Sequence, residues 1–209
     1  RDAQESRGLG DVYKRQDLCI PDITYLKDNI DRVKGFFITH GHEDHIGSLP
    51  YLLKKINVPV YGTALTVALI ANKIKEHNLG YVKLNVTTAG SHIQLGCFDV
   101  ELIHVNHSIS DAVGLALHTP AGVIVHTGDF KIDYTPIDGE VTDLNTLAAW
   151  GSRGVLAMLA ESTNVERPGY TMSEKKIGET FHNLFKDAKG RIIIAMFASN
   201  LHRIQQVVD

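Results

Sequence analysis

The chain has 209 residues, and 44% of them are hydrophobic, so it is long and apolar enough to form one domain or two small ones. Lys and Arg together number 21 and Asp and Glu 24, which gives a net charge of −3. This balance excludes an overall basic surface, so any binding of phosphate depends on a local cluster or on metal ions. No apolar run approaches the roughly 18 residues that a membrane-spanning helix needs, and we expect no membrane partner.

The cysteines and histidines point to different conclusions. Cys19 and Cys97 lie far apart and form no Cys-x-x-Cys pair, so they predict neither a disulfide framework nor a thiolate zinc site. This usage is typical of a reducing compartment, and we expect a cytoplasmic protein. The eleven histidines are more informative because several cluster with aspartate at short spacings.

The two ends of the chain differ from the rest. Residues 1–16 are polar and have neither apolar periodicity nor the hydrophobic segment of a secretory signal. We interpret them as a foreign leader of artefactual origin, or alternatively as a disordered arm. Residues 200–209 begin a helical pattern that stops. We therefore expect the chain to be an internal piece of a longer protein.

The first half of the chain predicts strands followed by helices. Residues 33–39 read as a buried strand, and Ser48 and Pro50 mark the start of a helix that ends before Pro59. A strand at residues 58–61 and a helix at residues 65–77 follow. The histidine-rich segment at residues 40–45 therefore lies on a loop between a strand and a helix.

The second half begins with sheet and ends with helix. Alternating apolar residues separated by glycine turns predict five strands, at residues 82–88, 92–95, 98–104, 113–118 and 123–127. Thr142 is expected to cap a helix over residues 143–150, before a buried strand at residues 155–160. Thr171 and Glu174 form a predicted capping box for a helix that stops at Gly190, and a strand over residues 191–198 follows. This alternation favours layered α/β architecture.

The segment His40-Gly-His-Glu-Asp-His45 has the pattern H-x-H-x-D-H. His40 and His42 lie two residues apart, so on an extended segment they face the same side and can reach one metal ion. Asp44 and His45, where the chain turns into the helix, can face a second ion. Mixed nitrogen and oxygen ligands suit zinc or manganese. An ordinary solvated loop is the alternative, but four ligand-type residues in six positions favour metal.

Two later residues extend this constellation. His107 follows the strand that ends near His104, and Asp129 follows the strand at residues 123–127. A carboxylate in the position of Asp129 can bridge two ions, which together activate water and withdraw charge from a phosphoryl or carbonyl group. Hydrolysis is the predicted chemistry, with Asp44 and Asp129 as the candidate catalytic carboxylates. The remaining histidines of this region are given structural roles: His104, His118 and His126.

The ordered set of six ligand-type residues resembles the signature of the metallo-β-lactamase superfamily, in which H-x-H-x-D-H is followed by a separate His and a separate Asp. Longer strings from residue 17 onward are similar to the bacterial ribonuclease J family. These strings occupy residues 17–22, 45–51, 106–108, 128–131, 161–164, 166–170 and 197–200.

This resemblance implies an αββα sandwich with an inserted β-CASP domain, two Zn²⁺ or Mn²⁺ ions, and RNA cleavage by endonuclease and 5′-to-3′ exonuclease action. It implies an incomplete metallo-β-lactamase domain over residues 17–165 and the start of a truncated β-CASP domain over residues 166–209. The implied ligands of the first ion are His40, His42 and His107, those of the second are Asp44 and His45, and Asp129 bridges the two. RNA is the implied partner, and full-length relatives are expected to form homo-oligomers or RNA-decay complexes in the bacterial cytoplasm.

The chain also departs from this family. Glu161 stands where many relatives have Asp, and the opening strands of the family are replaced by the leader. The later β-CASP histidine, the last metal-binding histidine and the C-terminal domain would lie beyond Asp209. We therefore expect the chain as given to bind metal weakly and to cleave RNA poorly.

Contacts to RNA are predicted from the segments near residues 162 and 199. Backbone N–H groups at a helix start and nearby hydroxyls can bind phosphate, and basic side chains can add charge. Ordinary helix capping is an equal alternative. The candidate phosphate-binding residues are Ser162, Ser199, Asn200 and Arg203. Asp111 and Asp133 are candidate outer partners of the ligand histidines.

Three other functions compete with a bacterial ribonuclease. One is a small-molecule hydrolase of the glyoxalase II or lactamase type, against which the strings at residues 161–164 and 197–200 argue. A second is a metal-silent RNA-binding subunit, against which the intact set of six ligand residues argues. A third is the eukaryotic cleavage-and-polyadenylation nuclease, against which the string at residues 166–170 argues.

Overall fold

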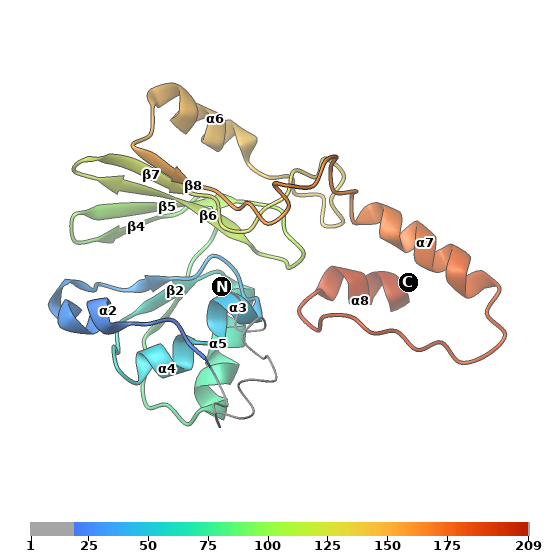
Figure 1. Cartoon of the computed structure of the whole chain (residues 1–209), viewed down its shortest axis with the longest axis horizontal. Coiled ribbons are helices and arrows are strands. Elements are labelled where there is room, and N and C mark those ends of the chain that lie inside the picture. The colour runs from blue at the N-terminus through green and yellow to red at the C-terminus, as the bar shows by residue number, and fades with distance from the viewer. Residues whose placement is uncertain (1–18, 209) are drawn as a thin grey trace.

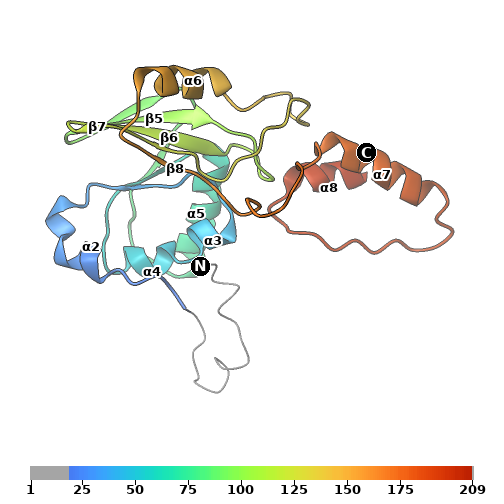
Figure 2. The ribbon, with the colours of Figure 1, turned by 45° about the horizontal axis from the view of Figure 1, so that its top comes forward.

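The computed structural model describes residues 19–208, and the predicted leader at residues 1–16 lies outside this range. Two β-sheets stack on each other, and helices cover the outer face of each sheet (Figures 1 and 2). Because each sheet has two apolar faces to bury, the four layers form in the order helix, sheet, sheet, helix. The structure confirms the predicted αββα sandwich.

The first sheet has three parallel strands in the order β1-β2-β3. Helix α5 connects β2 to β3 and packs on the sheet together with α4. The elements of this half are α2 (Thr24–Asp28), the 3-10 helix η1 (Ile30–Arg32), β1 (Phe36–Phe37), α3 (Glu43–Ile46), α4 (Leu49–Leu53), β2 (Val60–Gly62), α5 (Ala64–Glu76) and β3 (Leu84–Val86).

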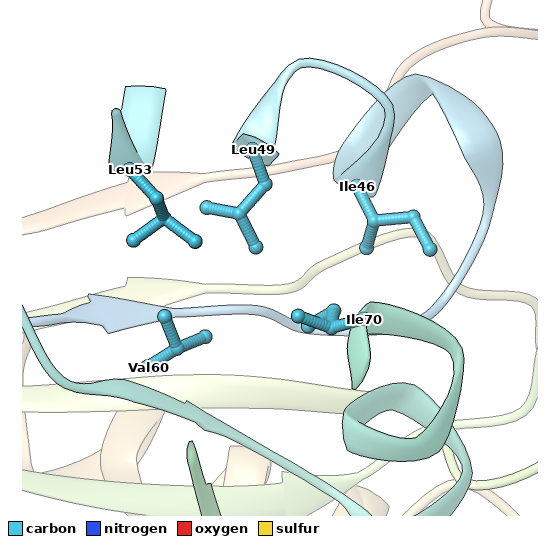
Figure 3. Close-up of a cluster of buried hydrophobic side chains, with 5 residues drawn as sticks. All are labelled: Ile46, Leu49, Leu53, Val60 and Ile70. Carbon is cyan, nitrogen blue, oxygen red and sulfur yellow. The ribbon is translucent and has the colours of Figure 1, made fainter. Parts of the chain in front are cut away.

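Five buried aliphatic side chains hold the first sheet to its helices (Figure 3). Ile46 comes from α3, Leu49 and Leu53 from α4, Val60 from β2 and Ile70 from α5. All five are at most 3% exposed. Burial of one such side chain contributes roughly 1.5–3 kcal/mol, so this cluster fixes α3, which carries two of the predicted ligands, against the sheet.

The second sheet has five strands in the order β4-β5-β6-β7-β8. Neighbours are antiparallel except β7 and β8, which run parallel. Helix α6 joins this last pair and lies on the outer face (Figure 2). The elements are β4 (His92–Leu95), β5 (Phe98–His104), β6 (Val113–Thr119), β7 (Gly122–His126), α6 (Leu144–Arg153) and β8 (Ala157–Leu159).

Alternation along β5 and β6 gives this sheet two apolar faces. Val100 and Leu102 point between the two sheets and pack near Phe37 of β1. Ile103 and Ala116 point the other way and pack under Trp150 of α6. The two central strands are therefore buried on both faces.

Two further helices project from the sandwich (Figure 1). Helix α7 (Lys175–Lys186) and helix α8 (Leu201–Val208) lie against each other. Glu174 joins their ends, because its carboxylate accepts from Arg203 Nη2 at 2.8 Å and its carbonyl accepts from Gln206 Nε2 at 2.9 Å. It also pairs with Lys131 Nζ at 3.2 Å, which links the helices to the sandwich.

Two predicted strands need correction. The predicted strand at residues 191–198 does not form, and Ile193 is 88% exposed, because no strand in the described part of the chain lies beside this segment to pair with it. The predicted buried strand at residues 155–160 exists as β8, but Met158 is 57% exposed. Its position at the edge of the sheet explains this exposure, since β7 is its one strand partner in the described chain.

Three predicted helix caps also need correction. Asp143, not Thr142, caps α6, and it accepts from the Thr146 N–H at 3.0 Å. Glu174 stands at the start of α7 but makes no capping box, because its carboxylate is used by the ion pairs described above. Ser48 precedes α4 without a side-chain capping bond. Within residues 19–208, no helix has the length and apolar character required to span a bilayer.

Candidate metal centre

Four of the six predicted ligands lie where β1 leads into α3. His40 is fully buried, and His42 has the extended backbone (φ −67°, ψ 153°) that precedes the helix. Asp44 and His45 follow in α3 itself. The loop passes close to α5: a Cβ on Gly41 would lie 2.5 Å from a methyl group of Leu69, which would have to shift to make room for it.

His107 and Asp129 come from two neighbouring loops of the second sheet. Asn106 fixes the first of these loops, because its N–H donates to Thr142 Oγ1 at 2.9 Å and its carbonyl accepts from Lys131 N at 2.8 Å. Its side-chain oxygen accepts from Thr142 N at 2.8 Å. These bonds tie the loop of His107 to the segment that follows Asp129, so one buried asparagine positions both ligand loops.

Three imidazole nitrogens converge at one point. His42 Nδ1 lies 3.1 Å from His40 Nε2 and 3.0 Å from His107 Nε2. A tetrahedral ion bonded to imidazole nitrogens at about 2.0–2.1 Å would hold two of them roughly 3.3 Å apart. The observed distances are close to this value, so the three histidines fit the predicted ligand set of the first ion without rearrangement.

The carboxylate of Asp129 lies between this group and His45. Its Oδ2 atom is 3.8 Å from His40 Nε2, 3.8 Å from His107 Nε2 and 3.4 Å from His45 Nε2. Asp44 Oδ2 lies on the far side, 3.6 Å from His45 Nε2. The structure thus brings all six predicted residues together: Asp129 Oδ2 lies within 4 Å of nitrogens of His40, His45 and His107, and Asp44 joins the group beside His45.

Two hydroxyl groups contact the ligand histidines from outside. Thr39 Oγ1 lies 3.1 Å from His40 Nδ1, and Ser108 Oγ lies 3.5 Å from His42 Nε2. In each ring this is the nitrogen that faces away from the centre, the position at which metal-ligating histidines usually have a hydrogen-bond partner. The sequence prediction missed both residues, although each is the direct chain neighbour of a ligand.

The outer partners that the sequence predicts are used elsewhere. Asp111 Oδ2 accepts from the N–H of Leu65 at 3.1 Å, in the first turn of α5. Asp133 accepts from the N–H groups of Thr135 and Glu174, at 3.0 and 3.3 Å. Both carboxylates therefore satisfy backbone N–H groups at loop and helix ends, and their prediction as partners of the ligand histidines is corrected.

The electrostatics of the centre favour neutral histidines and an ionised aspartate. Burial lowers the pKa of His40 and of His42, and it lowers the pKa of His107 from 6.5 to about 4. The hydrogen bond from His45 holds the pKa of Asp129 below its usual value of 3.8. At neutral pH the nitrogen lone pairs and the carboxylate charge are therefore available to a cation.

The predicted phosphate-binding residues lie in two other places. Ser162 is exposed on the loop after β8, and Ser199 is partly buried before α8. Asn200 is buried, and its Oδ1 accepts from Arg203 N at 3.1 Å, which is ordinary helix capping. Arg203 is paired with Glu174. Of these four, Ser162 and Ser199 have no side-chain hydrogen bond to another residue within residues 19–208.

A sequence profile of the metallo-beta-lactamase superfamily matches residues 8–164. The chain belongs to this superfamily. Within the superfamily it is 46% identical to ribonuclease J of Helicobacter pylori over 195 residues, which cover 92% of this chain and 28% of that protein. It is 44% identical to ribonuclease J of Mycolicibacterium smegmatis over 194 residues, which cover 92% of this chain and 35% of that protein. The chain thus spans about a third of the length of these relatives.

A solved structure supports the assignment of the fold. A protein of unknown function from Enterococcus faecalis superposes with a TM-score of 0.62 and 19% sequence identity, over 85% of this chain and 44% of the other. At this identity the likeness concerns the fold alone. The superfamily assignment agrees with the two stacked sheets and with the histidine and aspartate groups described above.

Proposed function

We propose that this chain carries the centre of a metal-dependent ribonuclease that hydrolyses phosphodiester bonds in RNA. The observation that carries the proposal is the convergence of His40, His42 and His107 beside the carboxylate of Asp129. It is supported by 44–46% identity to ribonuclease J over 92% of the chain. The similarity to these proteins suggests RNA as the substrate, and the arrangement of the side chains supports metal-dependent hydrolysis.

We assign a role to each of the six side chains. The first ion is held by His40, His42 and His107, and the second by Asp44 and His45, with Asp129 between them. Zn²⁺ or Mn²⁺ bound there would lower the pKa of water and withdraw charge from the scissile phosphate. Asp129 stays ionised at neutral pH, so its carboxylate binds cations rather than donating a proton.

Asp44 is the proposed proton acceptor. Its side chain is 40% exposed, compared with 31% for Asp129, so it is the more accessible of the two carboxylates to solvent water. Its Oδ2 atom can take the proton that the attacking water loses, and His45 at 3.6 Å then steadies the carboxyl group. Following the resemblance, we propose that both internal cuts and 5′-to-3′ removal of nucleotides occur.

We further propose that the second ion is held more weakly than the first. The position of the first ion is surrounded by nitrogens of His40, His42 and His107. Within residues 19–208, the position of the second ion is surrounded by Asp44, His45 and the shared Asp129. Affinity depends on the number of ligands and on their rigidity. The isolated chain is therefore expected to cleave slowly and to need a high concentration of the second ion.

The test is a cleavage assay with single-stranded RNA that carries a labelled 5′-monophosphate. The purified chain, stripped with chelator and supplied with Mn²⁺ or Zn²⁺, should release labelled mononucleotide and shorter internal fragments. Asp129→Asn and His107→Gln should each reduce the rate by at least about 100-fold. His77→Gln, which changes a histidine that packs on Tyr51 beyond the end of α5, is the matched control and should leave the rate unchanged.

Two outcomes would contradict the proposal. Cleavage that persists in Asp129→Asn, or without metal, would mean that the activity does not come from this centre. Hydrolysis of a thioester or a β-lactam by a chain that leaves RNA intact would favour the small-molecule hydrolase instead.

A further inference from the structure

A second group of ligand-type side chains lies on the outer face of the five-stranded sheet. His92 pairs with Glu101 across β4 and β5, and Asp99 pairs with His118 across β5 and β6. Asp99 and Glu101 are two residues apart in β5 and therefore face the same side. The register thus places two imidazoles and two carboxylates together, on the face that α6 covers.

The contacts within this group are close. His92 Nδ1 lies 3.0 Å from Asp99 Oδ2, and His118 Nε2 lies 3.5 Å from Glu101 Oε2. One ligand atom from each of His92, Asp99 and His118 can be chosen so that all three lie within 4.8 Å of one another. This spread is similar to the separation of ligand atoms around a single transition-metal ion.

Two observations indicate more than a set of surface ion pairs. His118 Nε2 is buried and has no hydrogen-bond partner within residues 19–208, although a buried ring nitrogen normally has one. Glu101 is 15% exposed, and Trp150 Nε1 donates to its Oε2 atom at 2.8 Å. Glu101, held by Trp150 and 3.5 Å from His118 Nε2, is therefore placed where a carboxylate can orient a metal-binding histidine.

We propose that His92, Asp99 and His118 bind one divalent transition-metal ion of the Zn²⁺ class, with Glu101 beside it. Nitrogen and carboxylate oxygen ligands suit Zn²⁺, Co²⁺ and Ni²⁺ better than Ca²⁺ or Mg²⁺. The site is separate from the candidate metal centre: Trp150 of α6 contacts its His118 and Glu101, whereas His107 and Asp129 lie in loops beyond the strand ends. Because its ligands come from three adjacent strands, binding would fasten β4 and β5 to β6 and stabilise the fold.

The site contains its own spectroscopic reporter. Trp150 is the single tryptophan of the sequence, and its ring packs edge-on against His118 with the ring centroids 4.6 Å apart. An open-shell ion such as Co²⁺ quenches a tryptophan at this range. Addition of Co²⁺ to the chelator-treated, untagged protein should therefore quench its tryptophan fluorescence in a saturable way, and Zn²⁺ should compete with the quenching.

Substitutions of the proposed ligands show whether the fluorescence quenching arises from Co²⁺ bound at this site. His92→Gln and Asp99→Asn change side chains that are 49% and 35% exposed, so both variants should fold, which circular dichroism can verify. Each should raise the Co²⁺ concentration at half-quenching by at least about tenfold. His107→Gln, which alters the first centre, and His77→Gln, a distant histidine, should leave the quenching curve unchanged.

The same experiment can overturn the inference. Quenching that is absent in the wild-type chain, or equal in His92→Gln and in the wild type, would mean that no ion binds beside Trp150. Loss of quenching in His107→Gln with retention in Asp99→Asn would assign the signal to the first centre. The stoichiometry of bound Zn²⁺ provides a second readout, since His92→Gln should bind one ion fewer than the wild type.

Discussion

Substitution of Gly128 tests how tightly the fold positions Asp129. Gly128 has φ +60°, in the left-handed region, and precedes the proposed bridging carboxylate directly. A Cβ at this position would lie 2.7 Å from the carbonyl oxygen of Val113 and 3.2 Å from Cβ of Thr39. Gly128→Ala therefore introduces backbone strain and a contact with main chain that cannot rotate away.

The size of the effect follows from two contributions. The left-handed conformation costs an alanine roughly 1–2 kcal/mol, and the contact with Val113 adds a further 1–3 kcal/mol, typical of overpacking. Alanine also lowers the conformational entropy of the unfolded chain, which stabilises the folded state by about 0.4–1 kcal/mol. Gly128→Ala should therefore lower the free energy of unfolding by about 1–5 kcal/mol.

Two other glycines separate these contributions. Gly139 has φ +82° with open space around the added Cβ, so Gly139→Ala carries the strain alone and should cost about 1 kcal/mol or less. Gly80 has no positive φ and no atom within 4 Å, so Gly80→Ala should be neutral or stabilising by about 0.5 kcal/mol.

Urea unfolding of the three variants measures these values, and Zn²⁺ titration shows the effect on the centre. Gly128→Ala should also weaken Zn²⁺ binding, because relief of the contact with Val113 moves the loop that carries Asp129. Equal stability of Gly128→Ala and Gly139→Ala would refute the claim that close packing fixes this loop. Unchanged Zn²⁺ affinity in a destabilised Gly128→Ala would refute the link to Asp129.

Three further predictions concern the surroundings of the centre. Because burial lowers the pKa of His107 from 6.5 to about 4, the unfolded chain binds a proton before the folded one as pH falls, so this residue alone should cost the metal-free protein about 2 kcal/mol of stability between pH 8 and pH 5. His40 and His42, whose pKa values burial also lowers, should add to this loss. His107→Gln should therefore make the pH dependence less steep in denaturant titrations, and an equally steep profile would contradict the contribution of His107. Asn106→Ala leaves the buried Thr142 N–H without its acceptor and should cost about 2–3 kcal/mol in thermal unfolding, whereas a loss below about 0.5 kcal/mol would show that the loop is held by other contacts. Glu174→Ala removes the ion pair with Arg203 and should speed hydrogen exchange in α8 without changing that of β5, and unchanged exchange in α8 would count against Glu174 as the link between the two helices.

Local patterns were sufficient to predict the strands of the second sheet. Residues 92–95 and 98–104 form β4 and β5 with the predicted bounds, because each alternates apolar and polar residues and Gly96 turns the chain between them. The same reasoning failed at residues 191–197, where the composition is equally suited to a strand. A strand also needs a neighbour to pair with, and this requirement is not visible in a local sequence pattern.

The six residues of the centre were predictable as a set because their types and order match a known signature. The residues that contact the ligand histidines from outside could not be predicted. Thr39 and Ser108 contact the ligand rings through geometry that spacing cannot reveal, whereas Asp133 serves backbone N–H groups far along the chain. His118 illustrates the same limit, since its sequence context indicates a structural residue and only the register of β5 and β6 places it beside Asp99.

Six side chains, from the segment between β1 and α3, from α3 itself and from two loops of the second sheet, are proposed to hold a pair of metal ions. Anomalous diffraction at the zinc edge, from crystals of the chain grown with Zn²⁺, tests this proposal most directly. One peak is expected about 2.0–2.1 Å from His40 Nε2, His42 Nδ1 and His107 Nε2, and a weaker one beside Asp44 and His45, with Asp129 between them. Crystals that contain Zn²⁺ but show no peak among these three nitrogens would contradict it.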